Sequence, residues 1–208
     1  SRLGPLSSTD LERFACLAGI QGLYPALTSG FLRELLDSRI ASALLVKGPN
    51  YEALDTAQTR TFRQLEQHIL RGERIGFRYR KDDGEKRYAD VAPYKLINHS
   101  GIWYLAGLEG GKLKAFSVML MQDLQVDDAS SFAPDPVHQA IIDAKEDVWF
   151  SEDTTEVLLR VAPEIAHYFT RRPLLPKQQQ RVDTDGSLLV TAQISHPDQL
   201  LPLVRYWL

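Results

Sequence analysis

The sequence predicts an α+β fold, with helices first, a small β-barrel next and a β-α-β-β-α sandwich unit last. Apolar residues recur with the 3.6-residue period of helices before Arg74 and with the two-residue period of strands after it. A Pro-rich break at 133–136 then separates these strands from a mixed pattern. These boundaries predict four parts: a helical linker region at 1–72, a barrel at 73–127, a connector at 128–149 and a C-terminal α/β extension at 150–208.

The first part of the chain carries short amphipathic patterns. Thr9 begins a sequence of the capping-box type, which predicts a helix start at that residue. A second helix is expected at 31–39. A further helix has Leu65 and Leu70 on its apolar face and ends at Gly72. Each apolar face is narrow, so we expect these helices to pack against other elements.

Strands follow Arg74. Ile75, Phe77 and Tyr79 alternate with polar residues, and Asp82-Asp83-Gly84 is a hairpin turn signal. Further strands are expected at 87–96, 102–108, 113–118 and 124–126. Five short strands joined by tight turns favour a small, strongly bent barrel that closes its own edges.

The C-terminal part is predicted to begin with a strand at 156–162 and a helix that opens at Pro163. A hairpin of strands 179–182 and 188–194 follows, and Pro197 opens a last helix. The apolar face of that helix is predicted to consist of Leu200, Leu201, Val204 and Trp207. The pattern stops inside this helix, so we expect the extension to be incomplete at its end.

Composition is that of an ordinary globular protein, with 44% hydrophobic and 25% charged residues and a net charge of −3. No apolar run approaches the ~18 residues of a membrane helix, no signal-peptide pattern is present, and Cys16 is the only cysteine. Cytoplasm is therefore the expected compartment.

Charge is unevenly distributed. Residues 60–114 hold 12 Lys or Arg against 7 Asp or Glu, whereas residues 115–208 hold 7 against 14. Variation among solvated faces explains this distribution as well as a basic surface for an anionic ligand does.

No motif predicts catalysis, a metal site or a cofactor. Phosphate-loop and nucleophile-elbow sequences are absent, and no histidine is spaced from another ligand residue as in known metal sites. The five histidines are His68, His99, His138, His167 and His196.

A ligand site is better supported, because the predicted barrel strands combine aromatic rings with cations. Rings can stack on bases and cations can bind phosphates, as a nucleotide or short single strand requires. Trp103 and Leu105 share a parity that favours the core, Tyr104 points to the opposite face, and Tyr79 fits core and pocket equally well. The candidate ligand-binding residues are Tyr79, Tyr94, Lys95, Tyr104, Lys114, Arg78 and Arg80. Arg78 and Arg80 could equally belong to a solvated strand face.

The triplet Trp103-Tyr104-Leu105 follows a Pro-containing strand and a turn, and it precedes a second turn and the run Lys114-Ala115-Phe116. This order of strands and turns resembles the WYL domain of bacterial transcriptional regulators. The resemblance implies an Sm/SH3-like barrel, the C-terminal extension that often follows it, and an anionic ligand. It carries over the residues Tyr79, Tyr94, Lys95, Trp103, Tyr104 and Lys114.

Two features depart from this resemblance. Ala89 and Leu120 stand where many WYL domains have arginines, which weakens bidentate recognition of phosphate. The winged helix-turn-helix with which such regulators usually begin is also not evident, since the first fifty residues lack a basic recognition helix. We expect that Ser1 begins partway along a longer protein.

The sequence thus predicts the ligand-sensing and dimerising region of a DNA-binding transcriptional regulator, a homodimer that senses a nucleotide or short nucleic acid. DNA would be bound by the missing winged helix-turn-helix, and no membrane partner is expected. Two alternatives remain open: a stand-alone barrel that binds single-stranded nucleic acid, and a purely structural dimerisation module.

Overall fold

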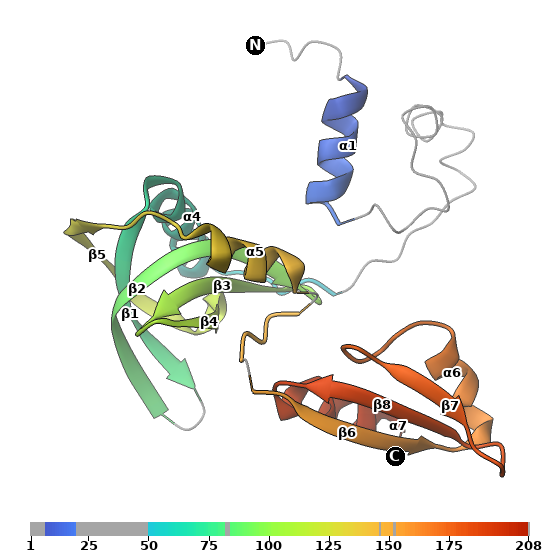
Figure 1. Ribbon diagram of the computed structural model, residues 1–208. Helices are drawn as coiled ribbons and strands as arrows, with labels where there is room; N and C mark the ends of the chain where they lie inside the picture. The colour runs from blue at the N-terminus through green and yellow to red at the C-terminus, as the bar shows by residue number, and fades with distance from the viewer. Residues whose placement is uncertain (1–6, 20–49, 82–83, 146, 152, 208) are drawn as a thin grey trace. The chain divides into compact units, whose positions relative to one another are not determined.

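The computed structural model describes residues 7–19, 50–81, 84–145, 147–151 and 153–207 (Figure 1). The chain divides into two units between Pro49 and Asn50, and each is described here by itself. Helices and two antiparallel sheets make up the described residues, so the α+β fold class is confirmed. The helix expected at 31–39 lies outside the described residues.

Helix α1 spans Ser8–Leu17, and its N-cap is Ser7 rather than the predicted Thr9. The Asp10 carboxylate accepts hydrogen bonds from both the backbone N–H of Ser7 (3.0 Å) and its hydroxyl (2.6 Å). The Ser7 hydroxyl in turn accepts from the backbone N–H of Asp10 (3.2 Å). A complete capping box two residues earlier therefore sets the start of the helix.

Helix α4 spans Thr56–Arg71 and begins with a capping box between Asp55 and Gln58. Leu65 is fully buried, as predicted, but Leu70 is 82% exposed and that prediction was wrong. Leu70 lies five residues after Leu65, about 140° away around the helix, so both cannot point to one core.

Gly72 ends α4, as predicted, in the left-handed conformation (φ 65°). A Cβ at this position would lie 2.7 Å from the carbonyl oxygen of Phe132. The backbone N–H of Phe132 donates to the Gly72 carbonyl (2.8 Å). Only glycine fits both the backbone angle and this close approach.

Five strands form the first sheet, in the order β4-β3-β2-β1-β5, with antiparallel pairing throughout. All five predicted strands are present, and β2 and β5 are longer than predicted. The strands are β1 (Glu73–Lys81), β2 (Gly84–His99), β3 (Ile102–Glu109), β4 (Lys112–Ser117) and β5 (Met121–Ser131). A 3-10 turn, η1 (Val118–Leu120), joins β4 to β5. Figure 1 shows the sheet curling on itself, consistent with a small barrel.

The inner face of this sheet carries the main hydrophobic core. Ile75, Phe77 and Tyr79 alternate along β1 with more exposed residues, as predicted. Leu65 brings α4 onto the same cluster. The buried members are Leu65, Ile75, Phe77, Tyr79, Val91, Leu105, Phe116, Val118 and Met121. We call this set the inner core.

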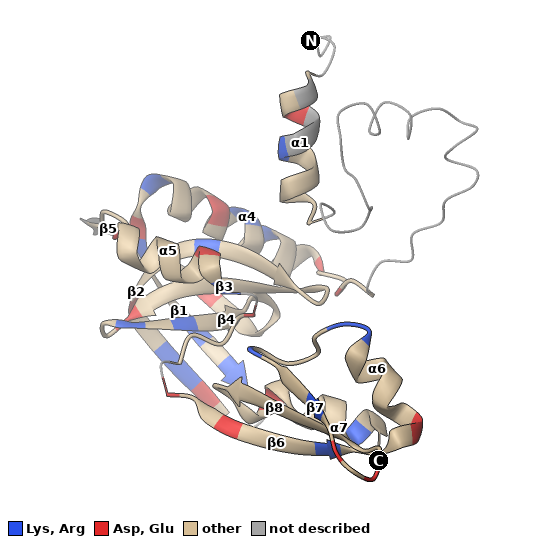
Figure 2. Ribbon diagram, turned by 45° about the vertical axis from the view of Figure 1, so that its right-hand side comes forward, with Lys and Arg blue, Asp and Glu red and all other residues tan. Residues whose placement is uncertain are grey.

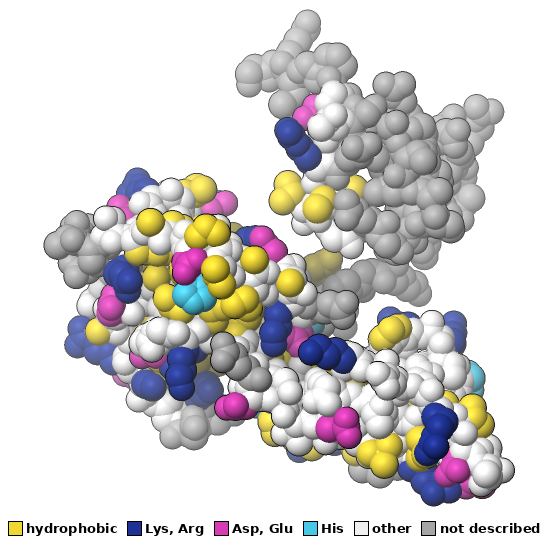
Figure 3. All heavy atoms as spheres, viewed as in Figure 1, with side chains coloured by type: hydrophobic (Ala, Val, Ile, Leu, Met, Phe, Trp, Pro, Cys, Tyr) yellow, Lys and Arg dark blue, Asp and Glu magenta, His cyan; other side chains and the backbone are white. Residues whose placement is uncertain are grey.

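The outer face of β2, β3 and β4 carries a second cluster, which includes Ala92, Ala106 and Phe150. Helix α5 (Pro136–Ala144) covers it and contributes Ile142. Hydrophobic side chains gather over this helix and its neighbouring strands (Figure 3), and Val137 is 64% exposed there. The connector is therefore packed on the barrel rather than free.

The C-terminal part has the predicted β-α-β-β-α order, with its strands arranged β6-β8-β7. Its elements are β6 (Thr155–Val161), η2 (Pro163–Ile165), α6 (Ala166–Thr170), β7 (Gln179–Val182), β8 (Leu188–Ile194), η3 (Pro197–Gln199) and α7 (Leu201–Trp207).

Val161, Phe169, Leu188 and Val190 form the core of this second sheet. The predicted apolar face of α7 was partly wrong, because Leu201 is exposed and Leu203 packs on the core together with Trp207. The 3-10 turn η3 precedes the helix, so α7 begins only at Leu201 and its buried face follows the pair Leu203 and Trp207, four residues apart.

Candidate ligand-binding site

The predicted ligand residues divide between the two faces of the first sheet. Tyr79 and Lys114 lie on the inner face, since they pair or alternate with members of the inner core. Tyr104 lies on the outer face, paired with Ile97, which packs against the second cluster. Tyr94 and Lys95 lie on that outer face as well. These side chains therefore do not form one continuous surface.

Tyr79 is a core residue, only 6% exposed. Its hydroxyl accepts a hydrogen bond from the backbone N–H of Ser117 (2.9 Å), at the end of β4. Burial raises the pKa of this phenol above its ordinary value. The side chain fixes the end of β4 over β1 and is not available to a ligand.

Tyr94 and Lys95 hold the connector against the outer face. The Tyr94 hydroxyl accepts from the backbone N–H of Asp135 (3.2 Å) and lies 3.3 Å from Nδ1 of His138. Lys95 pairs with Asp143 of α5. Both residues thus have partners within the protein, and Tyr94 is only 8% exposed.

Tyr104 is half-buried on the outer face. Desolvation raises its pKa above the ordinary value, and the nearby Glu52 carboxylate raises it further. Trp103 on the opposite parity packs edge-on against Phe62 of α4, with ring centroids 4.9 Å apart. Leu105 is fully buried. The predicted placement of Trp103 and Leu105 in the core is confirmed.

Arg78 and Arg80 are exposed residues of β1 that alternate with the buried Phe77 and Tyr79. Basic residues recur along the β1–β2 hairpin (Figure 2). Arg78 bonds to Glu85 (3.3 Å) and to Asp123, and Asp123 chiefly raises its pKa. It lines a shallow groove of about 120 Å³ with Asp123 and Gln125. Two carboxylates therefore already satisfy this guanidinium, while Arg80 is exposed.

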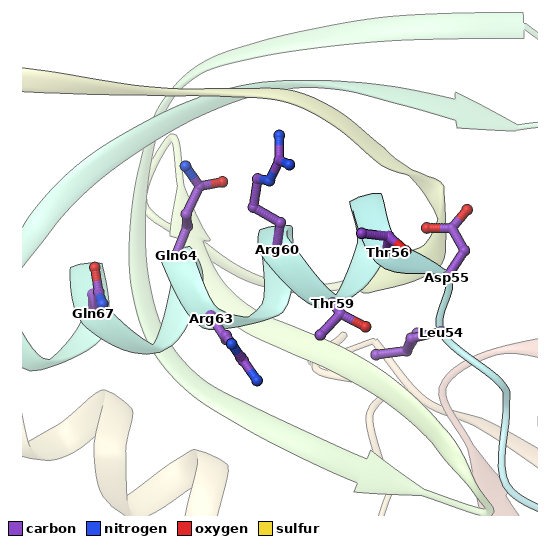
Figure 4. A pocket seen from close by; sticks show the side chains of 8 residues that line it. All are labelled: Leu54, Asp55, Thr56, Thr59, Arg60, Arg63, Gln64 and Gln67. Atoms are coloured by element: carbon purple, nitrogen blue, oxygen red, sulfur yellow. The ribbon is translucent and has the colours of Figure 1, made fainter.

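A larger, open hollow of about 440 Å³ lies along α4. Its described lining residues all come from that helix and the two residues before it, and they are polar except Leu54. Figure 4 shows Arg60 and Arg63 pointing in opposite directions from the helix. Two cations that diverge cannot hold one anion together, so this hollow is a weaker candidate.

The inner face offers a better arrangement at its rim, around Tyr88 of β2. The half-buried Tyr88 ring packs edge-on against Phe116, with centroids 4.9 Å apart. The ammonium nitrogen of Lys86 lies 4.8 Å from the centre of this ring, and that of Lys114 lies 5.8 Å from it. Both distances are those of cation–π contacts.

Glu109 completes this cluster. Its carboxylate accepts a hydrogen bond from Lys114 (2.5 Å), and the two side chains are 30% and 35% exposed. The Lys114 hydrogen bond is the main cause that holds the pKa of Glu109 below its ordinary value, and attraction by Lys86 adds to it. We call Lys86, Tyr88, Glu109 and Lys114 the rim cluster.

Sequence reasoning found Lys114 but missed Lys86, Tyr88 and Glu109. The hairpin turn at Asp82-Asp83-Gly84 was the signal that could have identified Lys86 and Tyr88, because a tight turn fixes which residues of β2 lie opposite which residues of β1. In the structure Lys86 pairs with Tyr79 and Tyr88 pairs with Phe77, which puts both on the inner face.

The rim cluster presents one aromatic ring and two cations to solvent at one place. This chemistry suits an anionic ligand that also carries a planar ring. Within the described residues, no group of three or more His, Cys, Asp and Glu side chains is arranged to bind a metal. None of the helices that the structure describes is long and apolar enough to cross a membrane.

Two family models match the chain. Residues 60–126 match the WYL domain and residues 153–207 match the WCX domain, together more than half of the chain. No curated protein matches it significantly. Solved structures that match include proteasome accessory factor B/C (PafBC) of Arthrobacter aurescens, at 18% identity and a TM-score of 0.38. That match covers 82% of this chain but only 25% of the other, so the chain spans about a quarter of that protein's length.

Proposed function

The chain belongs to the WYL-domain regulator family, with a WCX domain after the WYL domain, and on this premise we propose a specific role for it. It is the ligand-sensing and dimerising region of a DNA-binding transcriptional regulator of the bacterial cytoplasm. The ligand is a nucleotide or short single-stranded nucleic acid, and the region has no catalytic activity of its own. Ligand binding shifts the population of arrangements that the DNA-binding parts of the dimer adopt.

The observation that carries this proposal is the pair of ammonium groups over the Tyr88 ring. A base or sugar ring can pack on the tyrosine while a phosphate binds Lys86 and Lys114. Neither cation is a guanidinium, so phosphate is bound by point charges rather than by bidentate hydrogen bonds. Binding is therefore expected to be moderate in affinity and to weaken steeply with salt.

Lys114→Ala and Lys95→Ala form a matched pair that tests this site. Both are strand lysines paired with one carboxylate, but Lys114 is in the rim cluster and Lys95 bonds to α5 on the outer face. At low salt, Lys114→Ala should weaken binding of a short labelled oligonucleotide by about tenfold, the size of one lost charge contact of ~1.4 kcal/mol. Lys95→Ala should leave it nearly unchanged.

Fluorescence anisotropy at several salt concentrations measures this directly. Equal losses in the two variants would mean diffuse electrostatic attraction and would overturn the rim cluster as the site. No binding by the unaltered chain at low salt would remove the sensing role.

The second candidate is a purely structural dimerisation module. It is favoured by Leu120, which stands where many relatives of this family have an arginine and packs against the inner core. Both candidates include a homodimer. Light scattering at a protein concentration of tens of micromolar would check this, because dissociation constants of protein interfaces are ordinarily in or below that range. A stand-alone single-strand-binding barrel differs from both, because it would bind oligonucleotides with the same affinity as a monomer.

A further inference from the structure

We propose that Glu109 is an internal competitor at the rim cluster, which weakens every anionic ligand and so leaves those with a terminal phosphate monoester, rather than those with singly charged phosphates only, as the ligands that bind appreciably. This inference rests on the proposed ligand-binding function of the same cluster. It assigns to Glu109 the role of a competing carboxylate and narrows the ligand class to phosphate monoesters.

The geometry places the carboxylate where a ligand anion would bind. Glu109 Oε2 accepts from the Lys114 ammonium at 2.5 Å, and that ammonium also lies 5.8 Å from the Tyr88 ring centre. Lys86 reaches the same ring from β2 at 4.8 Å and attracts the same carboxylate. The protein therefore already supplies one negative charge to its two cations.

The hairpin turn that follows Glu109 keeps its carboxylate beside the Lys114 ammonium. It is the last residue of β3, directly before the Gly110-Gly111 turn, and it pairs with Lys112 across that turn and with Val91 on the other side. Both glycines have positive φ values (57° and 76°), which a two-residue hairpin of this kind requires. A tight turn gives the backbone of Glu109 little freedom, so the carboxylate stays near Lys114.

Charge then decides which ligands are favoured. A phosphodiester carries one negative charge and would only exchange one monoanion for another, so it gains little. A terminal phosphate monoester carries about −1.5 to −2 at neutral pH and offers three acceptor oxygens. It can bind both ammonium groups at once, which compensates for the displaced carboxylate.

The Tyr88 ring distinguishes two sources of the same phosphate chemistry. Inorganic phosphate has no surface to pack on the ring, whereas a 5′-phosphorylated nucleotide has a base and a sugar close to its phosphate. Stacking of a base on an aromatic side chain adds affinity beyond the phosphate contacts. We therefore assign the nucleotide 5′-phosphate, rather than free phosphate, to this site.

The test uses two labelled oligonucleotides of one sequence, one with a 5′-phosphate and one with a 5′-hydroxyl, titrated at low salt and pH 7.5. The unaltered chain should bind the phosphorylated probe about tenfold more tightly. Glu109→Gln should strengthen binding of both probes by a similar factor, about fivefold to tenfold, because either probe displaces the same carboxylate, so the preference is kept while the hydroxyl probe becomes easier to detect. Glu85→Gln is the matched control, since Glu85 pairs with a basic strand residue, Arg78, on the outer side of the barrel.

A second readout is the pH dependence of the preference. The second pKa of a phosphate monoester is about 6, so the preference of the unaltered chain should decline as pH falls from 7.5 to 5.5. The hydroxyl probe should show no comparable change, because a phosphodiester keeps its single negative charge throughout that range.

The outcomes separate this inference from the function on which it rests. If both probes bind equally and Glu109→Gln changes nothing, the role of Glu109 is overturned while the binding function stands. If neither the unaltered chain nor Glu109→Gln binds either probe, the proposed function itself fails. Equal competition by inorganic phosphate and by a 5′-mononucleotide would overturn the assignment of the ring to a base.

Discussion

The two sheets of this protein are both small and antiparallel, but their side chains differ in kind. The inner face of the first sheet is aromatic: the Tyr88 ring lies 4.9 Å from Phe116 and 5.3 Å from Phe77 between centroids. The core of the second sheet is mostly aliphatic and includes Leu188 and Val190. Cations lie against the rings of the first sheet. In the second sheet, Arg160 of β6 is bonded to Asp183 and Asp185 in the turn between β7 and β8.

The two sheets therefore differ in how far their cations are already neutralised by carboxylates of the protein. In the first sheet, Lys86 and Lys114 have one nearby carboxylate, that of Glu109, and the half-buried ring of Tyr88 beside them. In the second, the Arg160 guanidinium lies 2.5 Å from Asp185 and 3.6 Å from Asp183. Two cations with one anion can attract a ligand, while one cation with two anions cannot. The barrel is therefore where we place sensing.

The largest effect is expected from the helix that closes the barrel. Leu65→Ala removes a fully buried side chain from the inner core and should lower the free energy of unfolding by about 2–5 kcal/mol. Leu70→Ala on the same helix changes an 82% exposed side chain and should alter it by less than about 0.5 kcal/mol. Urea denaturation of both variants measures the difference.

Hydrogen–deuterium exchange would show where that loss falls. If the barrel and the second sheet have separate cores, Leu65→Ala should accelerate exchange in β1 and β2 and leave β8 protected. Equally accelerated amide exchange in β8 would show that the two sheets unfold together and do not have independent cores.

A smaller effect is expected from Tyr79→Phe, which separates the interior of the barrel from its rim. It removes the hydroxyl that accepts from the backbone N–H of Ser117 and should cost about 1–2 kcal/mol, because that part-buried donor loses its partner. Oligonucleotide binding should not change. Tyr206→Phe is the control, since Tyr206 is 77% exposed and its loss of a hydroxyl should be nearly neutral. Weaker binding by Tyr79→Phe at unchanged stability would return Tyr79 to the ligand site.

The order of helices and strands could be predicted because the spacing of apolar residues and the residues that form turns are local properties of the sequence. The hairpin of β7 and β8 begins and ends at the predicted residues, since Asp185-Gly186 fixes its turn. Predictions failed where two local signals compete. Ser7 and Thr9 both suit an N-cap, and only the structure shows that Asp10 bonds to Ser7. Leu201 and Leu203 are likewise equally apolar, and packing selects Leu203.

The site was less predictable, because it depends on which faces meet. Parity separates Tyr104 from Trp103 correctly, but it does not tell that α5 covers the outer face and takes Lys95 as an ion-pair partner. Nor does it tell that Tyr79 is bonded to Ser117. These are contacts between residues 38 and 48 positions apart, which no single-sequence pattern encodes.

The smallest effect concerns the second sheet and is a pH dependence. Asp185 accepts hydrogen bonds from the hydroxyl (2.5 Å) and backbone N–H (3.0 Å) of Ser187 and from Arg160 (2.5 Å). These bonds, those from Ser187 above all, hold the pKa of the Asp185 carboxyl well below its ordinary value. A depressed pKa stabilises the folded state above the unfolded pKa of ~3.9, and this contribution is lost as pH falls through the folded value.

Asp185→Asn should therefore lower the urea midpoint of the second sheet at pH 7, and the difference from the unaltered chain should shrink below about pH 4. Asp153→Asn, at an exposed position before β6, is the control for replacing a carboxyl outside this hairpin. A constant gap between Asp185→Asn and the unaltered chain down to about pH 2 would mean that the charge of Asp185 is not what closes the hairpin.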